Sequence, residues 1–269
     1  MRPQVMGVLN VTPDSFSDGG AWADLDAAVA HGRALLDEGA DVVDVGGEST
    51  RPGADPVGID VELARVVPVL EALSPVAEAA GRRLSVDTRH AEVAAAALAA
   101  GATIVNDVSA SLEQVAASAG AAWVAMHMKG EPATMQRDPR YDDVVTEVLD
   151  FLVEAAERGR RAGVEEVWID PGIGFGKTAD HSWTLLGALD QLVATRIPVL
   201  VGTSRKGFLG AAMRDADGTD EVPGPDDRLE GSITTAAWAA TMGAAMIRVH
   251  DVRATVAALD AVASAGAAG

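Results

Sequence analysis

Arg248 and His250 end a short apolar segment near the carboxyl end of the sequence, in the run MIRVHD over residues 246–251. Alternation along a strand would place both side chains on the same face. Two cationic groups at the end of a buried strand are costly unless an anion meets them. Because the net charge of the chain is −19, we expect that anion to be a ligand, and the pair predicts an anion-binding site.

Polar residues also end most of the other predicted strands. One such residue is adequately explained by helix capping or turn formation. Because nearly all the ends share this feature, we expect them to converge on one cavity. The segments concerned are 10–20, 44–53, 85–88, 105–107, 126–128, 170–177 and 202–206.

Eight short apolar segments alternate with alanine-rich amphipathic segments along the chain. The predicted strands are 5–9, 42–45, 84–87, 103–107, 122–127, 167–170, 199–202 and 246–250, and the predicted helices are 23–38, 60–73, 90–99, 112–119, 141–162, 181–194, 207–213 with 228–242, and 252–264. This alternation favours a single α/β domain over residues 1–269, a (β/α)8 TIM barrel, with an open doubly wound sheet as the alternative. The active face of such a barrel lies at the carboxyl ends of its strands. Residues 215–227, rich in glycine and proline, predict a mobile surface insertion.

The composition excludes several classes of protein. At 269 residues with 48% hydrophobic content the chain can bury a large core, and the absence of cysteine excludes disulfides, thiol catalysis and thiolate metal sites. The acidic charge argues against nucleic acid as a partner. No apolar run reaches the length of about 20 residues that spans a membrane, and no signal peptide is visible, so we expect a cytoplasmic protein without membrane contact.

Four polar residues at strand ends suit a flat heterocycle. The carboxylates of Asp87 and Asp170 and the amide of Asn106 can pair with several ring N–H donors. Lys206 can donate to a ring carbonyl. The four together predict a pocket for a small planar ligand.

The first and last strands supply a second group. Asn10, Arg248 and His250 combine a neutral oxygen, a fixed cation and an imidazole, which suits a phosphate or diphosphate with a Mg²⁺ ion. The two strands are neighbours in a closed barrel, so we expect the three side chains to meet. The glycine-rich loops after the first two strands are typical of mobile lids.

Seven motifs, in this order, resemble those of the dihydropteroate synthases. They are NVTPDSFSDGG (10–20), GGESTRPG (46–53), SVDT (85–88), VND (105–107), DPGIGF (170–175), SRK (204–206) and RVHD (248–251). The likeness covers essentially the whole chain. The first two motifs are highly specific, whereas DPG or SRK alone would be weak.

The resemblance implies a homodimeric barrel enzyme of folate biosynthesis that uses Mg²⁺. Its reaction joins p-aminobenzoate to 7,8-dihydropterin-6-ylmethyl diphosphate and releases 7,8-dihydropteroate and diphosphate. Carried over by motif, the pterin is held by Asp87, Asn106, Asp170 and Lys206, with Phe175 in the same substrate-binding set. The diphosphate is held by Asn10, Arg248 and His250, with Asn10 also contacting Mg²⁺, and p-aminobenzoate by Phe16, Ser17, Asp18, Thr50, Arg51, Pro52 and Ser204. The residue type of Met126, which ends the fifth predicted strand, predicts that it forms the floor of the pterin pocket.

The charges predict a dissociative, SN1-like substitution. Mg²⁺ with Arg248 and His250 would lower the barrier to diphosphate departure. The methylene cation left behind would be stabilised by Asp18 and Asp87, while closed loops exclude water. An aromatic amine is already neutral at pH 7, so it can attack without a strong general base.

Other functions remain open. A lone lysine such as Lys206 could form the Schiff base of a barrel aldolase. A non-catalytic pterin-binding protein would be expected to lose loop residues that are intact here. A methyltetrahydrofolate-dependent methyltransferase would share the pterin set without needing Arg248 and His250. His127 could be either a core histidine or part of the pocket, and His31, His90 and His181 are predicted to lie on helices at the surface.

Overall fold

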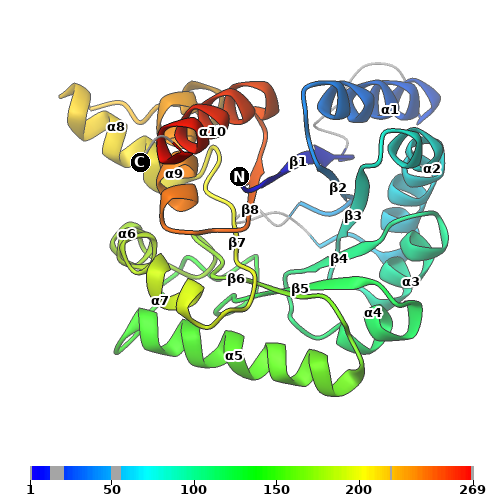
Figure 1. Ribbon diagram of the computed structural model, residues 1–269, viewed down its shortest axis with the longest axis horizontal. Coiled ribbons are helices and arrows are strands. Elements are labelled where there is room, and N and C mark those ends of the chain that lie inside the picture. Colours follow the sequence, from blue (N-terminus) through cyan, green and yellow to red (C-terminus); the bar gives the residue numbers. More distant parts are fainter. Residues whose placement is uncertain (1, 13–20, 50–55, 219, 268–269) are drawn as a thin grey trace.

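The computed structural model describes residues 2–12, 21–49, 56–218 and 220–267. Eight parallel strands form one sheet, and helices surround it (Figure 1). The strands are β1 Gln4–Asn10, β2 Val42–Gly46, β3 Arg83–Asp87, β4 Ile104–Asp107, β5 Ala122–Met126, β6 Val167–Asp170, β7 Leu200–Val201 and β8 Met246–Val249.

The sheet closes into a barrel. Its hydrogen-bonded order runs β6-β5-β4-β3-β2-β1-β8-β7. The two end strands meet through a parallel bridge between Ile169 and Val199, and the Ile169 N–H donates to the Pro198 carbonyl at 3.0 Å. The predicted barrel is therefore confirmed over the open-sheet alternative.

Helices follow the strands in the predicted order. They are α1 Ala21–Asp37, α2 Ile59–Ala79, α3 Ala91–Ala99, α4 Glu113–Ala119, α5 Val144–Ala162, α6 Ala179–Gly187, α7 Leu189–Ala194, α8 Gly207–Asp217, the short 3₁₀ helix η2 Pro225–Asp227, α9 Leu229–Thr241 and α10 Val252–Ala267.

Several predicted helix bounds were wrong. Helix α2 continues past Pro75 to Ala79, because its buried face, which includes Leu73 and Ala77, stays packed across the proline. Helix α5 begins only after Asp143, whose side chain accepts hydrogen bonds from two backbone N–H groups of the first turn. The predicted helix 181–194 is two helices that meet at Ala188.

The predicted insertion at 215–227 is only partly irregular. Its first three residues belong to α8, which ends at Gly218 in the left-handed conformation. The segment is largely exposed. Its mobility stays a prediction.

Strand alternation divides the core into two layers. Outward side chains pack under the helices, as Val43 and Val45 do. Inward side chains fill the barrel with an apolar plug made of Met6, Val42, Ile104, Ala122, Val124, Trp168, Leu200 and Met246. The next inward positions toward the carboxyl ends are polar, among them Asp44 and Arg248, so the plug forms the floor of the polar site.

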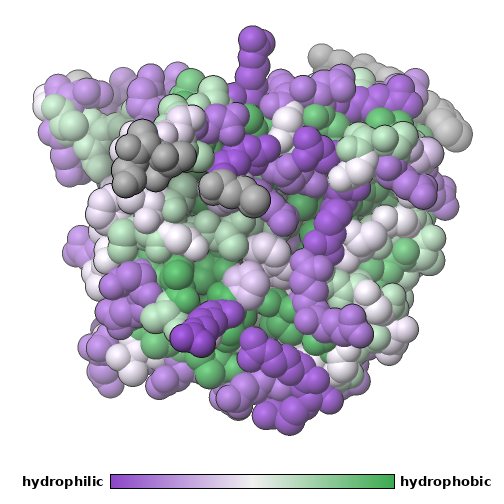
Figure 2. All heavy atoms as spheres, viewed as in Figure 1, coloured by the Kyte–Doolittle hydropathy of each residue, from purple (hydrophilic) through white to green (hydrophobic). Residues whose placement is uncertain are grey.

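Ion pairs gather at the opposite, amino-terminal end of the barrel. Asp41 pairs with Arg82 and, at 2.6 Å, with Arg2, and Arg83 pairs with Glu166 at 2.8 Å. Figure 2 shows the face that carries the chain termini, with hydrophilic side chains gathered near its middle.

None of the helices in the described part of the chain is long and apolar enough to cross a membrane.

Candidate active site

Arg248 lies between two carboxylates at the carboxyl end of the barrel. Its Nε donates to Asp44 Oδ2 and its Nη2 to Asp87 Oδ2, each at 2.7 Å. The Asp44 side chain is fully buried. The expectation that a ligand supplies the anion for Arg248 therefore needs correction: protein carboxylates from β2 and β3 already compensate this charge.

Burial and charge shift the pKa values of this group in opposite directions. Burial raises the pKa of Asp87 to about 7; nearby Arg248 works against this shift and Asp44 adds to it. Burial by itself would lower the pKa of Arg248, but the two carboxylates outweigh it and raise that pKa further. The arginine is thus permanently charged, whereas Asp87 can exchange a proton near neutral pH.

Asp44 connects the arginine to the amide predicted to hold a heterocycle. Its Oδ2 also accepts a hydrogen bond from Asn106 Nδ2 at 2.9 Å. Sequence reasoning did not select Asp44, although an aspartate at an inward position of an apolar strand is the signal that could have found it. Three buried oxygens here have no hydrogen-bond partner in the described part of the chain: Asp44 Oδ1, Asp87 Oδ1 and Ser85 Oγ.

A lysine and a carboxylate face each other on the other side of the pocket. Burial lowers the pKa of Lys206 to about 8, against the opposing effect of Asp170, and burial raises the pKa of Asp170. The ammonium group of Lys206 donates to the Ile173 carbonyl and lies 4.7 Å from the centre of the Phe175 ring. The structure therefore brings together Asp170 at the end of β6, Phe175 in the loop after β6, and Lys206, which follows β7.

Ser204 is joined to His250. The Ser204 hydroxyl lies 3.0 Å from His250 Nδ1 and accepts the His250 backbone N–H at 3.2 Å. Ser204 lies two residues before Lys206, the N-cap of α8, and its side chain orients the imidazole.

Asn10 lies beside an open space at Gly46. A methyl group at Gly46 would sit 3.7 Å from both Asn10 Oδ1 and Asp87 Oδ2. The glycine leaves this position empty between two oxygen atoms. Such a pair of hard oxygens suits Mg²⁺, which prefers oxygen ligands and keeps several waters.

A cavity of about 350 Å³ lies near the carboxyl end of β5, and Met126 lines it together with Arg89, His90, Ser109 and Phe151. Of the predicted pterin residues only Met126 belongs to this lining, so its place on the floor of a pterin pocket stays a prediction. His127 points elsewhere: its ring packs edge-on against Phe151 with centroids 5.0 Å apart. It is a buried histidine with a buried lysine partner, Lys177.

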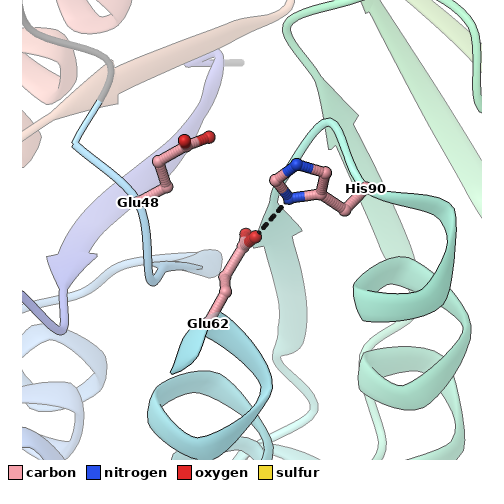
Figure 3. A group of neighbouring side chains, drawn as sticks. All are labelled: Glu48, Glu62 and His90. Carbon is pink, nitrogen blue, oxygen red and sulfur yellow. Dashed lines mark hydrogen bonds and ion pairs between the residues drawn. The ribbon is translucent and has the colours of Figure 1, made fainter. Parts of the chain in front are cut away.

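A second cluster of charges lies at the rim, where Glu48, Glu62 and His90 come from three different segments (Figure 3). His90 was expected on a surface helix. It instead precedes α3, half-buried, and its Nδ1 lies 2.6 Å from the buried Glu62. Glu48 accepts two hydrogen bonds from Arg89, at 2.9 and 3.0 Å. Although the three could approach one cation, Arg89 and His90 already partner both carboxylates.

Six predicted residues lie outside the described part of the chain. They are Phe16, Ser17, Asp18, Thr50, Arg51 and Pro52. Their assignment to the aminobenzoate side and the expected mobility of their loops stay predictions.

A barrel that gathers carboxylates, an arginine and a lysine at the carboxyl ends of its strands, beside a cavity, is an enzyme scaffold with a pocket for small molecules. A family model described as pterin binding enzyme matches residues 6–250. The chain is 50% identical to the dihydropteroate synthase of Mycobacterium leprae, covering 96% of this chain and 92% of the relative. It is 44% identical to that of Escherichia coli, covering 97% and 91%.

Solved structures agree with this match. The dihydropteroate synthase of Yersinia pestis superimposes with a TM-score of 0.89 at 43% identity, covering 99% of this chain and 95% of that one. The Xanthomonas albilineans enzyme gives 0.88 at 46% identity, covering 99% and 94%. The chain belongs to the pterin-binding enzymes and, among them, to the dihydropteroate synthases. Its activity is accordingly that of a dihydropteroate synthase, as the motifs predicted.

Proposed function

We propose that this pocket joins p-aminobenzoate to 7,8-dihydropterin-6-ylmethyl diphosphate by a dissociative substitution assisted by Mg²⁺. Two related structures support the substrate classes. The Xanthomonas albilineans enzyme was solved with 4-aminobenzoic acid, and a Yersinia pestis enzyme with a pterine–sulfa conjugate.

The incomplete hydrogen bonding of the buried carboxylates is the observation that carries the proposal. Asp44 Oδ1 and Asp87 Oδ1 are buried without partners in the part of the chain described, and such groups cost free energy until a donor reaches them. The N–H groups of a pterin ring are donors of the right kind. Asn106, which is paired in register with Asp87, and Asp170 at the end of β6 add further acceptors.

The leaving group needs more positive charge than Arg248 alone provides, because Asp44 and Asp87 already compensate that arginine. His250, oriented by Ser204, adds a second donor. Asn10 Oδ1 and Asp87 Oδ2, which both border the space beside Gly46, are oxygen atoms of the kind that Mg²⁺ prefers, and a bound Mg²⁺ ion would offset the charge of the departing diphosphate. Asn10 would be its neutral oxygen ligand.

The remaining steps follow from the charges in the pocket. When the carbon–oxygen bond to the diphosphate breaks, the exocyclic methylene becomes cationic and the electron pair leaves with the diphosphate. Ionised Asp87 stabilises this cation, with Asp18 in the same predicted role. The neutral arylamine then forms the new carbon–nitrogen bond and loses a proton to water.

Turnover of both substrates with and without Mg²⁺ tests the proposal. We expect 7,8-dihydropteroate to form from the purified protein with Mg²⁺ and to fall by about 100-fold or more when the metal is removed with a chelator. A folded protein that forms no product under either condition would contradict the proposal and leave a pterin-binding protein without catalysis.

The dissociative step has its own test. In crystals soaked with the pterin diphosphate and Mg²⁺ but no p-aminobenzoate, we expect the carbon–oxygen bond to break. An intact substrate under those conditions would argue for direct displacement.

The two other enzyme classes can be separated from this one. A methyltransferase of related fold would turn over methyltetrahydrofolate, and we expect no such activity because Arg248 and His250 are arranged for an anionic leaving group. An aldolase would form a Schiff base at Lys206, which borohydride would trap with a carbonyl substrate. We expect no trapping.

We also propose that the protein is a homodimer. Large apolar side chains are exposed on neighbouring helices, among them Trp183 on α6, 40% exposed, and Trp238 on α9, 48% exposed. Light scattering should give twice the chain mass of 27.5 kDa. A monomeric mass at micromolar concentration would contradict this proposal. The cytoplasmic location stays a prediction.

A further inference from the structure

We propose that Lys177 is a positioning residue that holds the loop 171–177 in the shape required for pterin binding. The inference rests on the proposed function and extends it to a residue outside the predicted substrate-binding set. Lys177 is only 3% exposed.

The amine of Lys177 is surrounded by acceptors. Its Nζ lies 2.9 Å from His127 Nδ1 and donates to the carbonyl oxygens of His127 at 3.2 Å and Phe175 at 3.1 Å. Burial lowers the pKa of Lys177 to about 7, and in its charged form the group has three N–H donors for these three acceptors. The lysine thereby joins the end of β5 to the loop after β6.

His127 serves as an acceptor in this arrangement. Burial, with a smaller contribution from nearby Lys177, lowers the pKa of His127 to about 3. The neutral ring then accepts a hydrogen bond from Lys177 at Nδ1 and carries its own proton on Nε2. This gives a use to the histidine whose role the sequence left open.

The loop is packed tightly against the backbone that Lys177 joins. Gly172 and Gly176 have φ angles of 61° and 59°. A methyl group on either would overlap a backbone carbonyl, that of His127 for Gly172 and that of Lys129 for Gly176. Tyr141 adds a hydrogen bond from its hydroxyl to the Gly176 carbonyl at 2.9 Å.

This loop makes three contacts with two residues of the pterin side of the pocket, Asp170 and Lys206. The Gly172 N–H donates to Asp170 Oδ1 at 2.7 Å, the Ile173 carbonyl accepts from Lys206, and the Phe175 ring lies under the Lys206 amine. None of these contacts involves Ser204 or His250. Loss of Lys177 should therefore impair pterin binding and spare the other end of the pocket.

Lys177→Met tests the inference, because it keeps the chain length and removes all three donors. We expect the calorimetric Kd for pterin-6-carboxylic acid and the KM for the pterin diphosphate to rise about tenfold or more. The KM for p-aminobenzoate should change less than about twofold. The matched control is Lys129→Met, since Lys129 is the neighbouring lysine with a 45% exposed side chain, and it should leave the pterin Kd within about twofold of wild type.

A second control separates positioning from plain loss of stability. Leu259→Ala removes a fully buried side chain of α10; it should lower Tm without raising the pterin Kd. If Lys177→Met folds poorly, His127→Phe removes one acceptor and keeps ring packing, and we expect a rise in pterin Kd of about threefold or more.

Three results would overturn the inference. Unchanged pterin affinity in both Lys177→Met and His127→Phe would show that the lysine serves stability alone. Equal losses for pterin and p-aminobenzoate would show a general effect on the pocket. A wild-type protein that binds no pterin would overturn the proposed function itself, and this inference with it.

Discussion

The two ends of the barrel use the same chemical pair in different ways. At the amino-terminal end, Arg83 and Glu166 are paired with side chains 32% and 43% exposed, so water completes their hydrogen bonds. At the carboxyl end, Arg248 is paired with fully buried Asp44 and with Asp87, 12% exposed. Buried oxygens of both carboxylates are left without partners in the described chain. At the surface, water satisfies the remaining hydrogen bonds of an ion pair, whereas the buried carboxylates need donors from a ligand.

Replacing Arg248 should have the largest effect. In Arg248→Ala we expect kcat/KM for the pterin diphosphate to fall about 10²–10³-fold, because a fixed donor to the leaving group is lost. Affinity for a pterin without a diphosphate should fall less, by about tenfold, because Asp44 and Asp87 lose the arginine that orients them. Steady-state kinetics and calorimetry give the two numbers, and equal losses would show that Arg248 does not serve the diphosphate.

The pH dependence of activity should show the same contrast. Burial raises the pKa of Asp87 to about 7, and Asp87 accepts a pterin N–H more strongly when it is ionised. Burial lowers the pKa of Lys206 to about 8, and this lysine is a stronger donor when it is charged. We therefore expect kcat/KM to rise through about pH 7 and to fall above about pH 8.

The variant Asp87→Asn should remove the rising limb of this profile.

The ionisation of Asp87 should affect stability in the opposite direction from activity: as pH rises, activity should increase and stability should decrease. Because its folded pKa lies above the unfolded value of about 3.9, the free energy of unfolding should fall as pH rises from about 4 to about 7. Urea denaturation at several pH values measures it, and an unfolding free energy that rises over that window in wild type relative to Asp87→Asn would contradict the assignment.

Replacing Arg83 should have the smallest effect. Its ion pair with Glu166 is partly exposed, and such pairs contribute about 1 kcal/mol or less. We expect Arg83→Ala to lower the free energy of unfolding by that amount and to leave kcat/KM within about twofold of wild type. A large loss of activity would show that the amino-terminal end also shapes the pocket.

The architecture could be predicted from sequence because strand and helix periodicities are local. Eight alternating units were enough to place the strand ends at one face and to bring Asp87, Asn106, Asp170, Lys206 and Arg248 together. The partners of Arg248 could not be predicted in the same way, since its contact with Asp44 spans 204 residues. A pattern shows that a charge needs a partner and does not show which one.

The same limit applies to residues that act through others. His90 was expected at the surface because its sequence neighbours are helical; its partner Glu62 comes from α2. Lys177 and His127 lie 50 residues apart, and their contact depends on the close approach of two loops. The residues of the first two loops, such as Asp18 and Arg51, stay predictions from the motifs.

Incomplete hydrogen bonding of buried charges, rather than charge alone, makes the carboxyl end a binding site. Calorimetric titration of pterin-6-carboxylic acid into Asp44→Asn and Asp41→Asn tests it most directly, because both variants remove a carboxylate that pairs with arginine, one at each end of the barrel. We predict a Kd raised about tenfold or more in Asp44→Asn and unchanged within about twofold in Asp41→Asn. Equal affinities in the two variants would contradict the account.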